Sequence, residues 1–393
     1  MEIERRRQAV EPPPSDDPGE ARLLELLRDE IECEGPLTFA RFMQRALYEP
    51  DLGYYAVSVT RPSRSGDFVT APEMHPIFGY TLARGLHEMW QRLGEPETFV
   101  LREYGAGRGA LALSLLEGLR RLGSPLLERL RYEPLDLPAQ LGALQDGLRA
   151  AGLQHLMAPA EGALVGCVLA NEYLDALPVH RLVMRDGRLR ELYVGWEGGR
   201  LVELAGELSS PDLAEWFAAA GVELAEGQRG EARLAMLAWL REVGEALERG
   251  YVLVLDYGGE PAELYGPTRP QGTLRAFRGQ HVGADVLSGV GRQDLTATVD
   301  LGALGRGARA AGLEWLDRTS QAEFLIGCGL EEVLARERQR VADSWAELAA
   351  LRSSVVRLLD PRALGGYAAV VMGRGVEPAP PLGGLSYRLP ERG

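Results

Sequence analysis

The pattern of apolar and polar positions along the 393 residues changes twice. Apolar residues first recur at helical spacing, then short apolar runs alternate with helical stretches, and a middle segment alternates apolar and polar residues one by one. The first part predicts helices over 20–34, after Thr38, and over 72–93. We therefore expect a helical N-terminal region at 20–95, after a polar, proline-containing and disordered lead-in at 1–19.

Alternation of strands and helices begins near residue 98. Apolar runs predict strands at 98–103, 130–136, 153–157, 164–170, 251–256, 313–318 and 367–372, with helices at 110–122, 139–151, 300–311 and 321–359. Strands that alternate with helices at this spacing are typical of a parallel, doubly wound sheet. We therefore expect an α/β core formed by residues 96–178 and 250–375, and a loose proline-rich tail at 376–393.

A different pattern separates the two parts of the core. Residues 179–205 alternate apolar and polar positions between glycine turns, which predicts antiparallel hairpins. Helices are expected after them at 211–220 and 230–249. We interpret 179–249 as an inserted region of hairpins and helices that builds the substrate side.

Composition excludes several classes of partner and enzyme. The net charge of −14 argues against a nucleic-acid partner, because phosphate binding needs a basic face, and it permits a cationic partner. All 43 basic residues are arginine, so the chain lacks the lysine that Schiff-base enzymes and P-loop nucleotide-binding proteins use. No apolar run is long enough to span a membrane, and we expect no secretory signal at the N-terminus.

The positions of cysteine and histidine bear on location and on metals. Cys33, Cys167 and Cys328 are odd in number and far apart, which fits a reducing, bacterial cytoplasm better than a disulfide framework. The five histidines show no spacing typical of a metal site, so we expect no metal.

A glycine-rich turn lies between the first expected core strand and its helix. Glu103 ends the strand, and Gly105, Gly107 and Gly109 follow it. Glycines let the backbone turn sharply and approach a ligand, and ligands of such sheets bind at the carboxyl ends of the strands. Asp136 ends the next strand, where its carboxylate could bind the ribose hydroxyls of an adenosine-containing cofactor. The alternative for the glycine-rich segment is a tight turn that binds no ligand. The alternative for Asp136 is an ordinary acidic residue at a helix N-terminus.

Polar residues also follow the buried strand at 164–170. Asn171 and Glu172 come first, and Asp175 lies three positions after Glu172, so a helical turn would place both carboxylates on one face. Two acids can bind and orient a cation such as a guanidinium, which presents a bidentate fork. The alternative is a helix cap followed by solvated acids.

Two further blocks have simpler interpretations. In the segment 66–73, Thr70 could cap a helix while Glu73 completes a capping box, which is a structural role. Asp256 ends the strand at 251–256, which is a functional location, although a turn aspartate is an equally good interpretation.

Together and in this order, the blocks resemble the MidA family, whose mitochondrial members are protein-arginine methyltransferases that assist complex I assembly. The matching residues are Gly66, Asp67, Phe68, Thr70, Pro72 and Glu73; Glu103, Gly105, Gly107 and Gly109; Asn171, Glu172 and Asp175 to Pro178; and Asp256 to Gly258, Gly272 to Arg275 and Asp294 to Ala297. The chain departs from the family pattern at Ala106, at Leu135 to Pro138 and at Thr298.

The resemblance implies a class I methyltransferase fold, a Rossmann-like doubly wound sheet with a last antiparallel strand, and S-adenosyl-L-methionine as cofactor. The residues expected to bind the cofactor are Thr70, Glu103, Gly105, Gly107, Gly109, Asp136 and Asn171. Because they lie at strand ends, Glu172 is our first candidate for the catalytic role, Asp175 the second and Asp256 a reserve.

We therefore expect an S-adenosylmethionine-dependent methyltransferase that methylates arginine on a cationic protein partner. One alternative is a class I methyltransferase that acts on a small molecule, and another is a non-catalytic assembly chaperone that retains the fold. A dinucleotide oxidoreductase is disfavoured by the spacing of the glycines. The leucine-rich helices could supply the interface of a homodimer.

Overall fold

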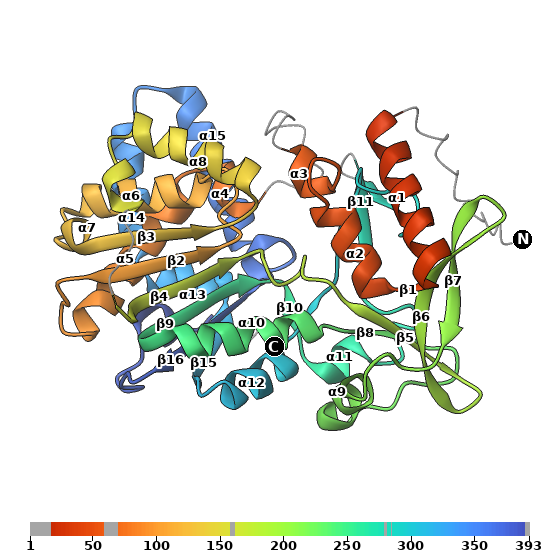
Figure 1. Cartoon of the computed structure of the whole chain (residues 1–393). Coiled ribbons are helices and arrows are strands. Elements are labelled where there is room, and N and C mark those ends of the chain that lie inside the picture. Colours follow the sequence, from red (N-terminus) through yellow and green to blue (C-terminus); the bar gives the residue numbers. More distant parts are fainter. Residues whose placement is uncertain (1–16, 59–69, 158–161, 279–280, 284, 390–393) are drawn as a thin grey trace, which may run out of the picture.

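Six strands form the central sheet of the core lobe, in the order β15-β16-β9-β4-β2-β3 (Figure 1). Their bounds are β2 Phe99–Tyr104, β3 Leu130–Leu135, β4 Leu164–Asn171, β9 Leu247–Asp256, β15 Glu314–Ser320 and β16 Ala368–Arg374. The strands from β3 to β9 are parallel, whereas β16 runs antiparallel to both of its neighbours. The computed structural model describes residues 17–58, 70–157, 162–278, 281–283 and 285–389. It confirms the predicted α/β class and the last antiparallel strand.

Helices cover both faces of this sheet, which makes it doubly wound. One face carries α5 Ile77–Arg92, α6 Ala110–Leu122, α13 Gln321–Gly327, α14 Leu330–Arg340 and α15 Trp345–Leu359, and the other carries α10 Leu234–Ala246 and α12 Leu301–Ala310. Neighbouring residues of β4 pack on opposite faces, since Leu169 belongs to the first apolar cluster and Val168 to the second. A strand buried on both faces needs a continuous apolar run, and β4 has one.

A second lobe lies beside the core lobe (Figure 1). Its antiparallel sheet contains β1 Leu37–Thr38, β5 His180–Arg185, β6 Arg188–Glu197, β7 Arg200–Gly206 and β8 Arg229–Ala232, and a smaller sheet contains β11 Arg275–Arg278, β12 His281–Gly283 and β13 Asp294–Thr296. The helices α1 Pro18–Glu34, α2 Phe39–Tyr48 and α3 Tyr54–Ser58 share its apolar core. The predicted hairpins at 179–205 are confirmed, and the region expected at 20–95 contributes to both lobes.

Four expected elements differ from the structure. The helix expected at 321–359 consists of three helices, α13, α14 and α15. Residues 154–157 form a 3₁₀ helix instead of a strand, because Leu153 and Leu156 recur at the three-residue spacing of that helix and are buried. The helix expected at 72–93 breaks into α4 Ala71–Met74 and α5, since His75 precedes a proline and is extended. Residues 230–232 belong to β8 because they pair with β5.

Part of the tail expected to be loose is packed, at residues 382–385, while 377–381 and 386–389 are exposed. Leu382 and Leu385 are buried, and Glu88 accepts hydrogen bonds from the backbone N–H of Gly383. Of the expected lead-in, residues 1–16 lie outside the described part, and Asp17 caps α1. The remaining elements are α7 Leu126–Arg129, α8 Pro138–Ala150, α9 Asp212–Ala220, α11 Pro261–Leu264, α16 Gly383–Ser386, η2 Gln154–Met157, η3 Leu364–Gly366, β10 Gly258–Gly259 and β14 Val299–Asp300.

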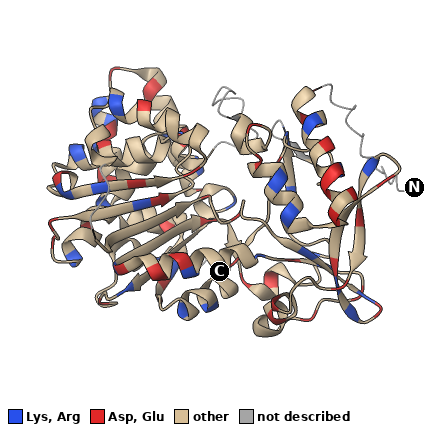
Figure 2. Ribbon diagram, in the orientation of Figure 1, with Lys and Arg blue, Asp and Glu red and all other residues tan. Residues whose placement is uncertain are grey.

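Charged residues of both signs lie on the outer helices of both lobes (Figure 2), and the central strand β4 carries none. Within the described ranges, no helix is long and apolar enough to cross a membrane.

Candidate functional site

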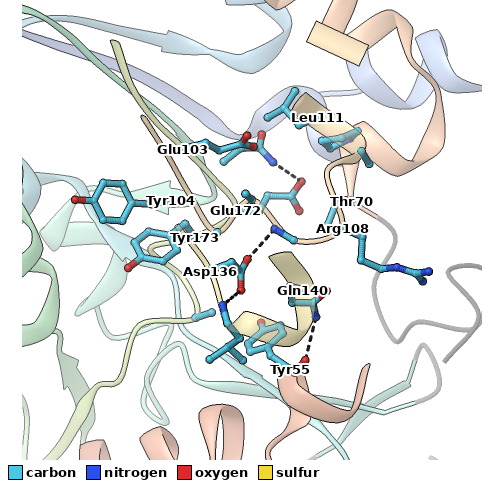
Figure 3. A pocket seen from close by; sticks show the side chains of 18 of the residues that line it. Tyr55, Thr70, Glu103, Tyr104, Arg108, Leu111, Asp136, Gln140, Glu172 and Tyr173 are labelled. Carbon is cyan, nitrogen blue, oxygen red and sulfur yellow. Dashed lines mark hydrogen bonds between the residues drawn. The ribbon is translucent and has the colours of Figure 1, made fainter. Parts of the chain in front are cut away.

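A cavity of about 520 Å³ lies where the two lobes meet, at the carboxyl ends of β2, β3 and β4. Its volume is within the range of small-molecule sites. The core lobe contributes Thr70, Pro72, Glu73, Glu103 to Arg108, Ala110, Leu111, Leu135 to Leu137, Gln140, Asn171 to Tyr173, Asp175 and Ala176, and the second lobe contributes Tyr48, Tyr54, Tyr55 and Asp294. Most of the predicted site residues therefore share one cavity, seen from close by in Figure 3.

The glycines of the turn after β2 differ in what surrounds them. Gly105, Gly107 and Gly109 all have positive φ, at 71°, 53° and 85°, which favours glycine. A Cβ added to Gly107 would enter open space, whereas a Cβ on Gly109 would come within 2.5 Å of Leu144 Cδ1. Gly107 therefore leaves room in the cavity, while Gly109 is required by the packing of α6 on α8 and does not line the cavity.

Asp136 ties the glycine turn to the end of β3. Its Oδ2 accepts a hydrogen bond from the backbone N–H of Gly107 at 2.7 Å, and its Oδ1 accepts one from Leu137 at 2.6 Å (Figure 3). Burial raises the pKa of Asp136, and these two hydrogen bonds partly offset that rise. Each carboxylate oxygen keeps a lone pair for a further donor, so the residue can still bind hydroxyls in the cavity.

Glu103 lies deeper, under the turn. Only 2% of it is exposed, and its Oε2 accepts a hydrogen bond from the Tyr132 hydroxyl at 2.5 Å. Burial raises the pKa of Glu103 to about 7, which the hydrogen bond from Tyr132 opposes. The carboxyl is thus fixed in position near the strand end, and burial favours its neutral form more than in water.

Glu172 follows β4 in a strained conformation. Its φ is 49°, a left-handed value that costs a non-glycine residue about 1–3 kcal/mol. Residues 172–178 form bends and a turn at 175–176 but no helix, so the predicted helical turn is wrong. The Oε1 atom accepts hydrogen bonds from the backbone N–H of Ala71 at 3.1 Å and from Asn171 Nδ2 at 3.5 Å. Burial, with Asp175 nearby, raises the pKa of Glu172 to about 8.

Asp175 and Asp256 differ in what they face. Asp175 lines the cavity, and its buried Oδ1 has no hydrogen-bond partner among the described residues. Asp256 does not line the cavity; its Oδ2 accepts hydrogen bonds from the backbone N–H groups of Leu174 and Asp175 at 2.9 and 3.2 Å. Burial raises the pKa of Asp175 to about 6, and burial and Asp175 raise that of Asp256. The geometry gives Asp256 a bracing role under the turn that carries Asp175.

Arg233 also stabilises the turn that carries Asp175. Its buried guanidinium donates hydrogen bonds to the carbonyl oxygens of Asp175, Leu177, Ala297 and Thr298, at 2.6 to 3.4 Å. Arg233 lies between β8 of the second lobe and α10 of the core lobe. It therefore joins the site turn to both lobes, a role that no motif in the sequence indicated.

The second lobe closes the cavity with aromatic rings. The Tyr48 hydroxyl donates to the carbonyl of Ala176 at 2.9 Å, and the Tyr55 hydroxyl donates to Asp294 Oδ1 at 2.9 Å. Their ring centroids are 5.4 Å apart. No sequence pattern indicated Tyr48, Tyr55 or Asp294 as site residues, although Asp294 belongs to a block of the MidA resemblance and Tyr55 to an aromatic, turn-rich segment.

Thr70 lines the cavity at the N-cap of α4, but its side chain makes no capping hydrogen bond, so that half of the predicted capping box is wrong. The other half is present, since the Glu73 carboxyl accepts a hydrogen bond from the backbone N–H of Thr70. The rest of that block, Gly66 to Val69, lies outside the described residues. Arg108 is the single basic residue in the described lining, and its side chain points away from Asp136 and Glu172 (Figure 3).

The cavity fits the cofactor that the resemblance implies. S-adenosylmethionine carries an ammonium group and ribose hydroxyls, all of which are hydrogen-bond donors. The cavity offers acceptors to match, in the carboxylate of Asp136 and in Asn171 Oδ1, which is shielded from solvent and without a partner among the described residues. The open space at Gly107 leaves room for a ligand to approach the backbone.

Comparisons with known proteins agree with this fit. A family model of S-adenosyl-L-methionine-dependent methyltransferases matches residues 81–319. The mitochondrial protein arginine methyltransferase NDUFAF7 homolog of Drosophila melanogaster is 32% identical over 319 residues, which cover 72% of this chain and 69% of that protein. The protein arginine methyltransferase NDUFAF7 of Rattus norvegicus is 27% identical over 380 residues, 87% of this chain and 82% of that protein.

A solved structure is similar over almost the whole chain. It is a protein from Burkholderia thailandensis, crystallised with S-adenosyl-homocysteine, with 30% sequence identity and a TM-score of 0.83. The match covers 95% of this chain and 97% of that one, so it includes both lobes. With more than half of its length matched by the family model, the chain belongs to the family of S-adenosyl-L-methionine-dependent methyltransferases.

Proposed function

We propose that this chain transfers methyl groups to arginine side chains of a protein substrate. The observation that carries the proposal is that the carboxyl groups of Glu172 and Asp175 line the same cavity as the glycine turn. A guanidinium is planar and cationic and offers several N–H donors, which carboxylates bind in pairs. The names of the relatives from Drosophila melanogaster and Rattus norvegicus, both protein arginine methyltransferases, support the same acceptor.

The chain's residues would prepare the acceptor in two ways. The cofactor, when bound, supplies an electrophilic methyl group on a sulfonium. Glu172 and Asp175 would hold the guanidinium and direct one nitrogen at that methyl, and such positioning supplies much of the rate in a displacement. As the nitrogen–carbon bond forms and the sulfur–carbon bond breaks, the nitrogen must lose one proton, and the Glu172 carboxylate would accept it.

The protonation state of Glu172 is compatible with that role. Burial raises its pKa to about 8, which favours the neutral form when no cation is beside it. A guanidinium placed beside it would favour the carboxylate form, because an opposite charge at short range lowers the pKa of a carboxyl group. Glu172 would then become a base when the acceptor binds.

The test combines labelling with one substitution. Purified protein, S-adenosylmethionine labelled in the methyl group and a cell lysate should yield a labelled protein band, and acid hydrolysis of the band should release methylarginine. Glu172→Gln should lower the turnover about 100-fold or more while S-adenosylhomocysteine still binds. Glu197→Gln, at an exposed position at the end of β6, is the matched control. Label in a small molecule, or in no product, would contradict the proposal and favour the small-molecule enzyme or the chaperone.

A further inference from the structure

Tyr48, on α2 of the second lobe, lies beside the turn that carries Asp175. Its hydroxyl donates to the carbonyl of Ala176, the residue directly after Asp175. That hydrogen bond, made across the junction of the two lobes, fixes the position of the ring. Because the hydroxyl is used in this bond, the ring is the part of Tyr48 that remains for a ligand.

The neighbours of Tyr48 hold the ring in place. The Tyr55 ring lies 5.4 Å away, centroid to centroid, with an interplanar angle of 32°. Tyr55 is itself fixed by Asp294 through its hydroxyl and by Gln140 Nε2, which donates to its carbonyl at 2.9 Å. Asp294 and Tyr55 line the cavity with Tyr48. The second lobe therefore presents a rigid aromatic wall with a carboxylate beside it.

Asp175 supplies an acceptor on the core-lobe side of the same cavity. It is 7% exposed, and Tyr257 and the backbone of Ala176 lie close to its carboxyl group, but its Oδ1 has no hydrogen-bond partner of good geometry in the part of the chain that the structure describes. An unpaired buried carboxylate oxygen is costly, so a donor that reaches it gains more than it would in water. A flat cation can satisfy both sides at once, since guanidinium stacks on aromatic faces and donates in its own plane.

We propose that Tyr48 and Asp175 form the acceptor subsite, in which a guanidinium stacks on the ring of Tyr48 and donates a hydrogen bond to Asp175 Oδ1. This subsite rests on the proposed function and adds to it the basis for selecting arginine. A lysine ammonium has the charge but no plane to stack, and citrulline has a plane but no charge. The subsite thus selects for planarity and charge together.

The experiment measures equilibrium binding, so it does not depend on turnover. A short glycine-rich peptide with one arginine is titrated into the full chain in the presence of S-adenosylhomocysteine, alongside matched peptides with lysine or citrulline. The wild type should bind the arginine peptide about tenfold more tightly, or better, than either analogue. Tyr48→Leu should abolish that preference, and Tyr48→Phe, which keeps the ring, should retain most of it. Tyr193→Leu, a tyrosine of β6 outside the cavity, is the matched control.

Two results would overturn the subsite. One is a wild type that binds the three peptides equally. The other is a Tyr48→Leu variant that loses tenfold or more in S-adenosylhomocysteine affinity while its peptide preference is unchanged, which would assign the ring to the cofactor. Thermal unfolding of each variant separates these results from a folding defect, and Tyr48→Phe remains informative if Tyr48→Leu does not fold. Methylarginine in the labelling experiment reports on the proposed function independently of this binding preference.

Discussion

The core lobe and the second lobe build their halves of the cavity in different ways. The core lobe uses backbone turns and carboxyl groups at strand ends, all within a few residues of β2, β3 and β4. The second lobe uses side chains from separate elements, with Tyr48 on α2, Tyr55 on α3 and Asp294 on β13. The chemistry of the reaction thus depends on local sequence, whereas the wall that meets the acceptor depends on how distant segments pack.

The largest effect is expected where the two lobes are joined. Replacing Arg233 with methionine removes the guanidinium donor from the carbonyls of Leu177, Ala297 and Thr298, while that of Asp175 keeps the backbone N–H of Ala297. The loss should cost about 3–4 kcal/mol of unfolding free energy. Urea unfolding measures this loss. Arg233→Lys should recover part of it, and Arg241→Met, on the exposed face of α10, should change it by less than about 0.5 kcal/mol. Equal stability of Arg233→Met and wild type would show that the lobes do not depend on this joint.

A smaller effect should separate two glycines within the core lobe. Gly109→Ala meets Leu144 and a left-handed backbone, so it should lose about 2–3 kcal/mol of stability. The folded protein should still bind S-adenosylhomocysteine. Gly107→Ala should lose only about 1 kcal/mol of stability, but its methyl group occupies cavity space and should weaken S-adenosylhomocysteine about tenfold or more. Calorimetry and urea unfolding on both variants check the contrast, and the reversed pattern would refute it.

The effect of pH on stability has opposite signs in the two lobes. Glu172 has a folded pKa of about 8 against an ordinary 4.5, so its contribution to stability is full below pH 4.5 and is lost as pH rises to 8. In the second lobe, burial alone would raise the pKa of Glu191, but hydrogen bonds from His180 and Ser209 outweigh it and lower that pKa. Its contribution is present above pH 4.5 and is lost as pH falls further.

Unfolding free energies between pH 3.5 and 8.5 test this contrast. Glu172→Gln should flatten the decline from pH 4.5 to 8 by about 1 kcal/mol or more. Glu191→Gln should be destabilising at pH 7 and less so in acid. If both variants changed the unfolding free energy over the same pH range and in the same direction, the proposed difference between the lobes would be wrong.

Sequence patterns predicted the core lobe well because its signals are local. The strand ends at Glu103, Asp136 and Asn171 and the turn after β2 follow from short stretches of sequence, and the structure places all of them in one cavity. The different roles of Gly107 and Gly109 could not be predicted from the sequence, because they depend on the contact of Gly109 with the Leu144 side chain of α8. The conformation of Glu172 was also hidden, because a left-handed residue after a strand has no pattern of its own.

The second lobe was predicted in its hairpins but not in its contacts. Tyr48 lies 128 positions before its hydrogen-bond partner Ala176, and Tyr55 lies 239 before Asp294. Pairings at such separations leave no periodicity in the sequence. Arg233 was equally hidden, since carbonyl acceptors exist at every residue. The expected homodimer and the cytoplasmic location stay predictions.

The placement of β16 has a consequence for the order in which the chain folds. This strand, at residues 368–374, pairs with β9 on one side and β15 on the other. Until it has been synthesised, β9 exposes an unpaired apolar edge and β15 has no partner in the sheet, so the central sheet cannot close during translation. An exposed edge of this kind is a template for pairing with another chain. A truncation before residue 368 should therefore give aggregates rather than a smaller folded enzyme.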